Sequence, residues 1–195
     1  FTGVVVSAYL ESTLLGVIAG ILAGMLIAFI LGWFHLYLET DIILAGTAIN
    51  ILATGGTIFL LFVLTGDKGN SSGLASGVVP NVNIPFIEDI PFIGKIISGQ
   101  HVFVWLAFIL TWVVSIFLYR TPFGTHLRAV GESPEAAESL GINVNRTRMA
   151  GLLISGFLAS LGGLTMSMAY LPLFQREMTA GRGFIALAAV YLGGR

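Results

Sequence analysis

The feature that most constrains the fold is a set of four long apolar segments without any Asp, Glu, Lys or Arg: residues 12–36, 42–64, 101–119 and 149–170. A bilayer core about 30 Å thick is crossed by roughly 20 apolar residues in a helix. Charged residues make up only 10% of the chain, whereas soluble domains hold about 25%. We therefore predict an all-α, polytopic bundle of membrane helices, in a multi-pass protein of the cell membrane.

The two ends of the chain hold shorter apolar stretches. A fifth apolar run starts at Gly183 and reaches the last residue, Arg195, before it is long enough to span a bilayer. We therefore expect four complete transmembrane helices plus a truncated fifth, in a fragment of a single transmembrane domain that covers residues 1–195. Residues 1–9 are expected to be the end of an earlier element.

The distribution of basic residues predicts the orientation of the spans. Residues 65–100 hold two lysines against three acidic side chains. Residues 120–148 hold four of the nine basic residues: Arg120, Arg128, Arg146 and Arg148. Because cytoplasmic loops carry the excess of Lys and Arg, we predict that residues 120–148 form a cytoplasmic loop and residues 65–100 an external loop. A formal net charge of −1 argues against a nucleic-acid partner.

The sequence carries no signature of catalysis or of metal binding. It has no cysteine, and no stretch reads G-x-x-x-x-G-K-[ST], the loop that holds the phosphates of ATP. His35, His101 and His126 are not spaced with serines or carboxylates as a hydrolytic site would require. We therefore expect no catalytic residue, no metal and no cofactor in this chain.

A ridge of small residues runs along the first apolar segment at every fourth position: Gly16, Gly20, Gly24, Ala28 and Gly32. In lipid, helices attract each other mainly by close packing, which small residues permit. We interpret this small-residue ridge as a packing surface for another helix.

Polar residues recur on one face of the second apolar segment. Asn50, Thr54 and Thr57 stand at i, i+4 and i+7, beside a pair of glycines. A polar side chain inside a membrane either pairs with a neighbouring helix or lines a polar path. The sequence leaves both interpretations open.

A short polar segment, "LRAVGESPEAAESLGINV" at residues 127–144, stands between two apolar spans. Ser133 suits an N-cap, the proline after it suits the first helical position, and the next glutamate favours the positive end of the helix dipole. Gly141 suits the left-handed end of a helix. We predict a short helix over residues 134–140 that needs docking to be stable, with an apolar face of Ala136, Ala137 and Leu140. From composition alone, the alternative is a surface helix that only connects two spans.

Several separated stretches resemble one family of membrane proteins. They are "RTPFGTHLRAVGESPEAAESLGINVNRTR", "MAGLLISGFLASLGGL", "FQREMTAGRGFIALAAV" and the upstream "IPFIEDIPFIGKI". Together they resemble the permease subunits of ATP-binding-cassette importers, in the branch that serves ribose-like sugars, nucleosides and branched-chain amino acids. The likeness covers roughly residues 41–190, and is greatest to the nucleoside-type and simple-sugar-type permeases. It departs at the final "YLGGR".

The resemblance implies partners and a role for the polar segment. In that family the cytoplasmic loop carries a coupling helix, on which a separate ATPase subunit presses, so ATP is expected on the partner and not on this chain. By this resemblance the coupling residues are Gly131, Glu132, Glu135, Ala136, Ala137, Glu138 and Gly141. Glu135 and Glu138 would meet donors on the ATPase, the alanines would allow close seating, and the two glycines would turn the chain. Further implied partners are a second permease subunit, an external substrate-binding protein and the lipid bilayer.

The resemblance also suggests a solute. A nucleoside offers ring faces for stacking and ribose hydroxyls for hydrogen bonds with amides. The residues expected along its path are Asn50, Thr54, Phe174, Arg182 and Phe184. A simple sugar is the closest variant of this prediction, and a branched-chain amino acid is an alternative within the same family.

Two other classes of membrane protein compete with an importer subunit. A secondary transporter driven by an ion gradient uses carboxylates inside the membrane, and here Glu11, Glu39 and Asp41 all stand at the ends of the apolar spans. A scaffold without transport does not account for the polar face at Asn50. Dependence of uptake on ATP or on an ion gradient separates the two transporter classes.

Overall fold

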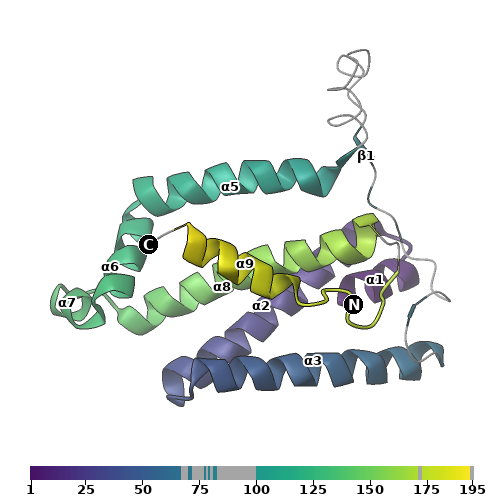
Figure 1. The fold of residues 1–195 in the computed structure, drawn as a ribbon, viewed down its shortest axis with the longest axis horizontal. Coiled ribbons are helices and arrows are strands. Elements are labelled where there is room, and N and C mark those ends of the chain that lie inside the picture. The colour runs from purple at the N-terminus through teal and green to yellow at the C-terminus, as the bar shows by residue number, and fades with distance from the viewer. Residues whose placement is uncertain are drawn as a thin grey trace, which may run out of the picture.

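The computed structural model describes residues 1–66, 70–71, 77, 79, 81–82, 100–170 and 173–193. Helices dominate this part of the chain (Figure 1), and a two-residue antiparallel pair places Asn81 opposite His101. In order, the elements are α1 (Thr2–Tyr9), α2 (Thr13–Tyr37), α3 (Ile42–Thr65), β1 (Asn81–Val82), β2 (Gln100–His101), α5 (Val102–Arg120), α6 (Pro122–Glu132), α7 (Pro134–Ser139), α8 (Val144–Leu164), the π-helix η1 (Thr165–Tyr170) and α9 (Arg182–Leu192).

Four helices of the described residues are long and apolar enough to cross a membrane, namely α2, α3, α5 and α8 continued by η1. The predicted all-α membrane bundle is confirmed. The predicted spans differ from α2, α3 and α5 by at most one residue at either end. The fourth helix begins earlier than predicted, at Val144, because the Asn143 side chain accepts a hydrogen bond from the Arg146 backbone N–H at 3.0 Å and caps a charged first turn. The apolar helix α9 is shorter.

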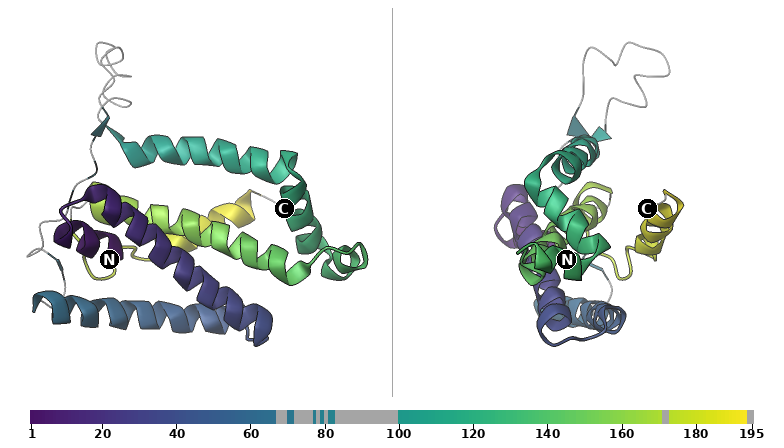
Figure 2. Two further views of the ribbon diagram at one scale, coloured as in Figure 1. Left: turned by 180° about the vertical axis from the view of Figure 1, so that it is seen from behind. Right: turned by 90° about the vertical axis from the view of Figure 1, so that its left-hand side faces the viewer.

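The small-residue ridge of α2 packs against other helices, as predicted. In the described part of the chain, α2 and α8 share the most extensive helix contact, and the two helices cross in the middle of the bundle (Figure 2). A Cβ atom built on Gly24 would lie 2.5 Å from the Ser160 Cβ, and one on Gly20 would lie 2.7 Å from the Leu164 Cδ2. Nearer the start of α2, a Cβ built on Gly16 would lie 2.6 Å from the Ser7 Cβ of α1. At Gly16 and Gly24 an added methyl group would meet a Cβ or backbone atom of the neighbouring helix, whereas at Gly20 it would meet the Leu164 side chain alone.

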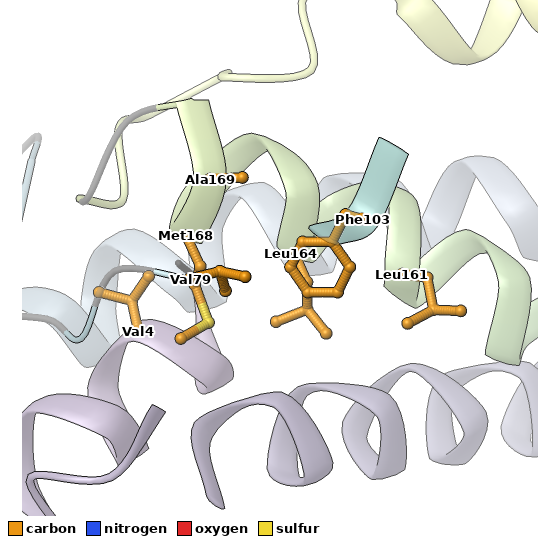
Figure 3. Close-up of a cluster of buried hydrophobic side chains, with 7 residues drawn as sticks. All are labelled: Val4, Val79, Phe103, Leu161, Leu164, Met168 and Ala169. Atoms are coloured by element: carbon orange, nitrogen blue, oxygen red, sulfur yellow. The ribbon is translucent and has the colours of Figure 1, made fainter. Parts of the chain in front are cut away.

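A buried apolar cluster closes one end of the bundle, where α1, η1 and the start of α5 meet α8. Figure 3 shows its members converging: Val4, Val79, Phe103, Leu161, Leu164, Met168 and Ala169. The last carbonyls of a helix have no partner within it, and here the Val79 N–H donates to the Met168 carbonyl at 3.1 Å. The Gly77 N–H likewise donates to the Ser7 Oγ at 3.3 Å. These bonds tie the chain that follows α3 to the end of the bundle.

The remaining helices surround the crossed pair. Figure 1 shows α5 on one side of the crossed pair and α3 on the opposite side, and the views in Figure 2 agree. The helices α6 and α7 lie at the end of the bundle opposite α1. Large apolar side chains such as Ile51, Phe108 and Trp112 are exposed on α3 and α5. Such side chains are stable in contact with lipid or with further membrane helices.

A cysteine-labelling experiment tests the predicted orientation. Ser139 is exposed at the end of α7, and Ser76 belongs to the predicted external loop, most of which lies outside the described residues. Because the chain has no cysteine, Ser139→Cys and Ser76→Cys each introduce a single thiol. In intact cells an impermeant maleimide is expected to label Ser76→Cys and to label Ser139→Cys only after permeabilisation. The opposite pattern would place the α6–α7 loop outside the cell.

Candidate functional site

A cavity of about 330 Å³ lies among α1, α2, α3 and the end of α8, and residues 174–179 border its remaining side. Its volume is at the lower end of the range for small-molecule sites. The small-residue ridge forms part of its wall through Gly20 and Gly24. The close helix packing and the cavity therefore share the same face of α2.

The polar face of α3 lines this cavity. Asn50, Thr54 and Thr57 all contribute to its wall, as expected for residues at i, i+4 and i+7 of one helix. The Thr54 Oγ1 donates to the Asn50 carbonyl at 2.9 Å, and the Thr57 Oγ1 donates to the Ala53 carbonyl at 2.7 Å. Each hydroxyl hydrogen is thus used within the helix, while the oxygen lone pairs remain available as acceptors. The Asn50 amide makes no hydrogen bond among the described residues, so it can both donate and accept.

An aromatic ring faces the cavity from the segment after η1. Phe174 lines the wall and packs edge-on against Phe1, with ring centroids 5.3 Å apart. Its backbone is held by Ser71, a fully buried residue. The Ser71 N–H donates to the Phe174 carbonyl at 2.8 Å, and the Phe174 N–H donates to the Ser71 Oγ at 2.7 Å. These two hydrogen bonds hold the Phe174 backbone and thereby position its ring.

The cavity combines a few polar groups with apolar walls. Besides the α3 face, it has one guanidinium, from Arg176, and one carboxylate, from Glu177. Within the described ranges no three His, Cys, Asp or Glu side chains are grouped as a metal site. The arrangement suits weak contacts with an uncharged polar solute that carries hydroxyl or amide groups and a flat apolar face.

The structure brings together three of the five predicted path residues and leaves two apart. Asn50, Thr54 and Phe174 line one cavity, whereas Arg182 and Phe184 do not. Arg182 begins α9, a helix with no buried residue, and its guanidinium contacts the Met166 sulfur. Phe184 is 76% exposed. Neither residue lines the cavity, although Arg182 contacts Met166, which does.

The predicted short helix is present between two spans as α7. The Ser133 Oγ accepts a hydrogen bond from the Ala136 N–H at 3.3 Å, the proline occupies the first turn, and Gly141 is left-handed with φ +80°. A second helix, α6, precedes it and was not predicted. Its signal was the pair Thr121 and Pro122, because the threonine side chain caps α6 and the proline opens it.

The structure corrects two details expected of this α6–α7 loop. Gly131 lies inside α6 and does not turn the chain, since the turn occurs at Ser133. Ala137 is 2% exposed, and α7 contacts α6 and α8, so this alanine packs within the chain and is not available to a partner. Leu140, expected on the docked face, is 80% exposed. Apart from Ala137, the predicted coupling residues are exposed: Gly131, Glu132, Glu135, Ala136, Glu138 and Gly141.

The chain is similar to permease proteins of ATP-binding-cassette transporters. It is 37% identical over 156 residues to the guanosine permease protein NupQ of Bacillus subtilis, a match that covers 80% of this chain and 48% of the relative. It is 38% identical over 157 residues to the nucleoside permease protein NupC of Lactococcus lactis, covering 80% and 49%. A putative glucose permease protein of Haloferax volcanii, TsgC13, is 31% identical, covering 78% and 46%.

These relatives are named as transport components and not as enzymes. The chain spans about half of the length of each of them. No solved structure matches the chain. The family model described as branched-chain amino acid transport system, permease component, matches residues 1–195. The chain is therefore a multi-pass membrane protein that belongs to the family of branched-chain amino acid transport system permease components.

Proposed function

We propose that this chain forms part of the path of a nucleoside through an ATP-driven importer of the cell membrane. The observation that carries the proposal is the cavity in which the Asn50 amide and the Thr54 hydroxyl share a wall with the ring of Phe174. Ribose hydroxyls can exchange hydrogen bonds with an amide and donate to a hydroxyl oxygen. The base of a nucleoside can stack on an aromatic ring.

The relatives support this choice of solute. Two of them are named for guanosine and for nucleosides, and their identity to this chain exceeds that of the relative named for glucose. A simple sugar could use the polar side of the cavity but leaves Phe174 without a flat base to stack on. A branched-chain amino acid carries one positive and one negative charge. The cavity residues of opposite charge, Glu177 and Arg176, are both exposed.

The energy for transport is proposed to come from a separate ATPase that binds the α6–α7 loop. The sequence has no ATP-binding loop of its own. The loop presents the exposed Glu135, Glu138 and Leu140 at one end of the bundle. A partner that contacts them can move α5 and α8, between which the loop is inserted, and so open the path alternately to each side. A second permease subunit and an external substrate-binding protein complete the proposed importer.

Substitution of the polar face of α3 tests the path. In the complete importer, Asn50→Leu and Thr54→Val are each expected to lower nucleoside uptake about two- to twelvefold, since a net hydrogen bond contributes roughly 0.5–1.5 kcal/mol. Uptake of labelled guanosine in cells measures this, with assembly and ATP hydrolysis followed in the purified complex. Both of the latter are expected to remain.

A matched control lies on the same helix. Thr47 is outside the cavity, and its hydroxyl donates to the Leu44 carbonyl at 2.9 Å, so Thr47→Val removes a hydroxyl in the same local setting as Thr54→Val. Uptake through Thr47→Val is expected to equal that of the unchanged importer. Equal uptake by all three variants would show that the polar face of α3 serves helix packing and not the solute path. Uptake of glucose or leucine, but not of guanosine, would overturn the proposed solute.

A further inference from the structure

A second open groove, of about 300 Å³, lies at the opposite end of the bundle from the cavity described above and shares no lining residue with it. It is formed where the end of α2, the start of α3, α6 and the first turns of α8 meet. Most of its lining is apolar, from Leu36, Ile42, Leu127, Val130 and Leu152. The groove is at the end of the bundle that carries residues 120–148, the loop with four arginines.

One arginine lines this groove without a carboxylate to neutralise it. Arg148 is half-buried on α8 and lines the groove, and it forms no ion pair within the described ranges. No acidic residue lines the groove. Two acids adjoin lining residues in sequence. Asp41, before Ile42, is the cap of α3, where its Oδ1 accepts hydrogen bonds from the backbone N–H groups of Ile43 and Leu44 at 2.7 and 3.2 Å. Glu132, after Gly131, is exposed at the end of α6 and does not line the groove. The positive charge therefore remains available to an anion.

A histidine adds a second polar group to the same groove. The Nδ1 of His35 lies 2.9 Å from the Thr40 carbonyl oxygen, and because a carbonyl only accepts, this nitrogen carries the hydrogen. The Nε2 of His35 is then left as the second hydrogen-bonding atom of the ring. His35 and Arg148 come from α2 and α8, the two helices that cross in the bundle.

We propose that this groove binds an anionic phospholipid, with its phosphate on Arg148 and an acyl chain along Leu36, Ile42 and Leu152. A guanidinium is suited to phosphate because it offers several N–H donors in a plane. The apolar lining gives the reason for choosing a lipid over free phosphate, since a free anion leaves that lining in contact with water. Basic pockets between membrane helices bind lipid headgroups in this manner.

The site also touches the proposed coupling loop. Leu127, Val130 and Gly131 of α6 form one wall of the groove, so a bound lipid would hold α6 against α2 and α8. This consequence for coupling rests on the proposed function, whereas lipid binding itself does not. Binding and uptake can therefore fail separately.

Native mass spectrometry of the complete importer, purified in detergent, tests the binding. Phosphatidylglycerol is added, with phosphatidylcholine as the uncharged comparison. Arg148→Gln is expected to lower retention of phosphatidylglycerol about fivefold, in keeping with roughly 1 kcal/mol for each basic residue near a lipid headgroup. Arg146→Gln is the matched control, because it removes the same charge from an exposed position two residues earlier that does not line the groove. Its retention is expected to stay within about twofold of the unchanged importer.

A second variant adds an apolar side chain to the wall of the groove. A Cβ built on Gly131 meets no atom within 4 Å, and leucine is a better helix former than glycine, so Gly131→Leu is expected to fold. It is expected to reduce retention of phosphatidylglycerol while Arg148 is still present. Equal retention by the unchanged importer, Arg148→Gln and Gly131→Leu would overturn the proposal. Displacement of the lipid by millimolar inorganic phosphate would also overturn it, in favour of a site for free anions.

Discussion

Gly24→Ala is expected to destabilise the permease by about 1–3 kcal/mol, the usual cost of overpacking a well-packed site. The new Cβ would lie 2.5 Å from the Ser160 Cβ and 3.3 Å from the Gly156 carbonyl oxygen. A contact of 2.5 Å is not tolerated between carbon atoms, so α2 and α8 must separate along their crossing. Thermal melting of the purified full-length permease, followed by tryptophan fluorescence, is expected to show a lower midpoint.

Two further variants make this test specific to the α2–α8 crossing. Gly46→Ala places the same methyl group on α3, where a Cβ meets nothing within 4 Å, and it is expected to be neutral or slightly stabilising because alanine favours a helix. Ser160→Gly removes the atom that Gly24→Ala would strike. The double variant Gly24→Ala with Ser160→Gly is therefore expected to melt at a higher temperature than Gly24→Ala alone. If Gly24→Ala and Gly46→Ala melt alike, the ridge is not a packing requirement.

Reversal of the two exposed acids of α7 is expected to have the largest effect on assembly. Changing Glu135 and Glu138 together to lysine should weaken binding of the ATPase about 100-fold, since opposed like charges cost several kcal/mol and 1.4 kcal/mol corresponds to tenfold in affinity. The helix itself is expected to persist, because its Ser133 cap and its buried Ala137 are unchanged. Co-purification of the ATPase with the tagged permease measures the effect.

The control for charge is an acid at the same end of the bundle. Glu39 is exposed between α2 and α3, outside the α6–α7 loop, and Glu39→Lys is expected to leave the ATPase bound. Leu140→Ser gives an independent test of the same surface, because this exposed side chain is expected to be covered by the partner. Unchanged co-purification of the double lysine variant would make α7 a connector between two spans.

The four spans and α7 could be predicted from the sequence because each is determined by a local pattern, whereas α6 was not predicted. Four charge-free segments of sufficient length predict four spans, and the ends at Ser133, Pro134 and Gly141 predict α7. The small-residue ridge of α2 predicted close packing, and the polar face of α3 followed from the helical period. Each of these signals lies within one turn or one helix.

The candidate cavity could be predicted only in part. The i, i+4, i+7 spacing from Asn50 to Thr57 placed those residues on one face, but the sequence left open whether that face pairs with a helix or lines a path. Ser71 was missed because its partner, Phe174, is 103 residues away in sequence. Arg182 and Phe184 were chosen for their chemistry, and the structure places them on α9, outside the lining of the cavity.

The sequence by itself determined that this chain is a bundle of membrane helices with a capped polar helix between two spans, since hydrophobicity, helical period and capping act over neighbouring residues. Only the tertiary structure decided which faces meet. It brought the ridge of α2 onto α8, joined the α3 face to Phe174 in one cavity, buried Ala137 and exposed Leu140. These outcomes depend on backbone distances between segments far apart in the chain, because steric exclusion at a few glycines sets how closely two helices can approach.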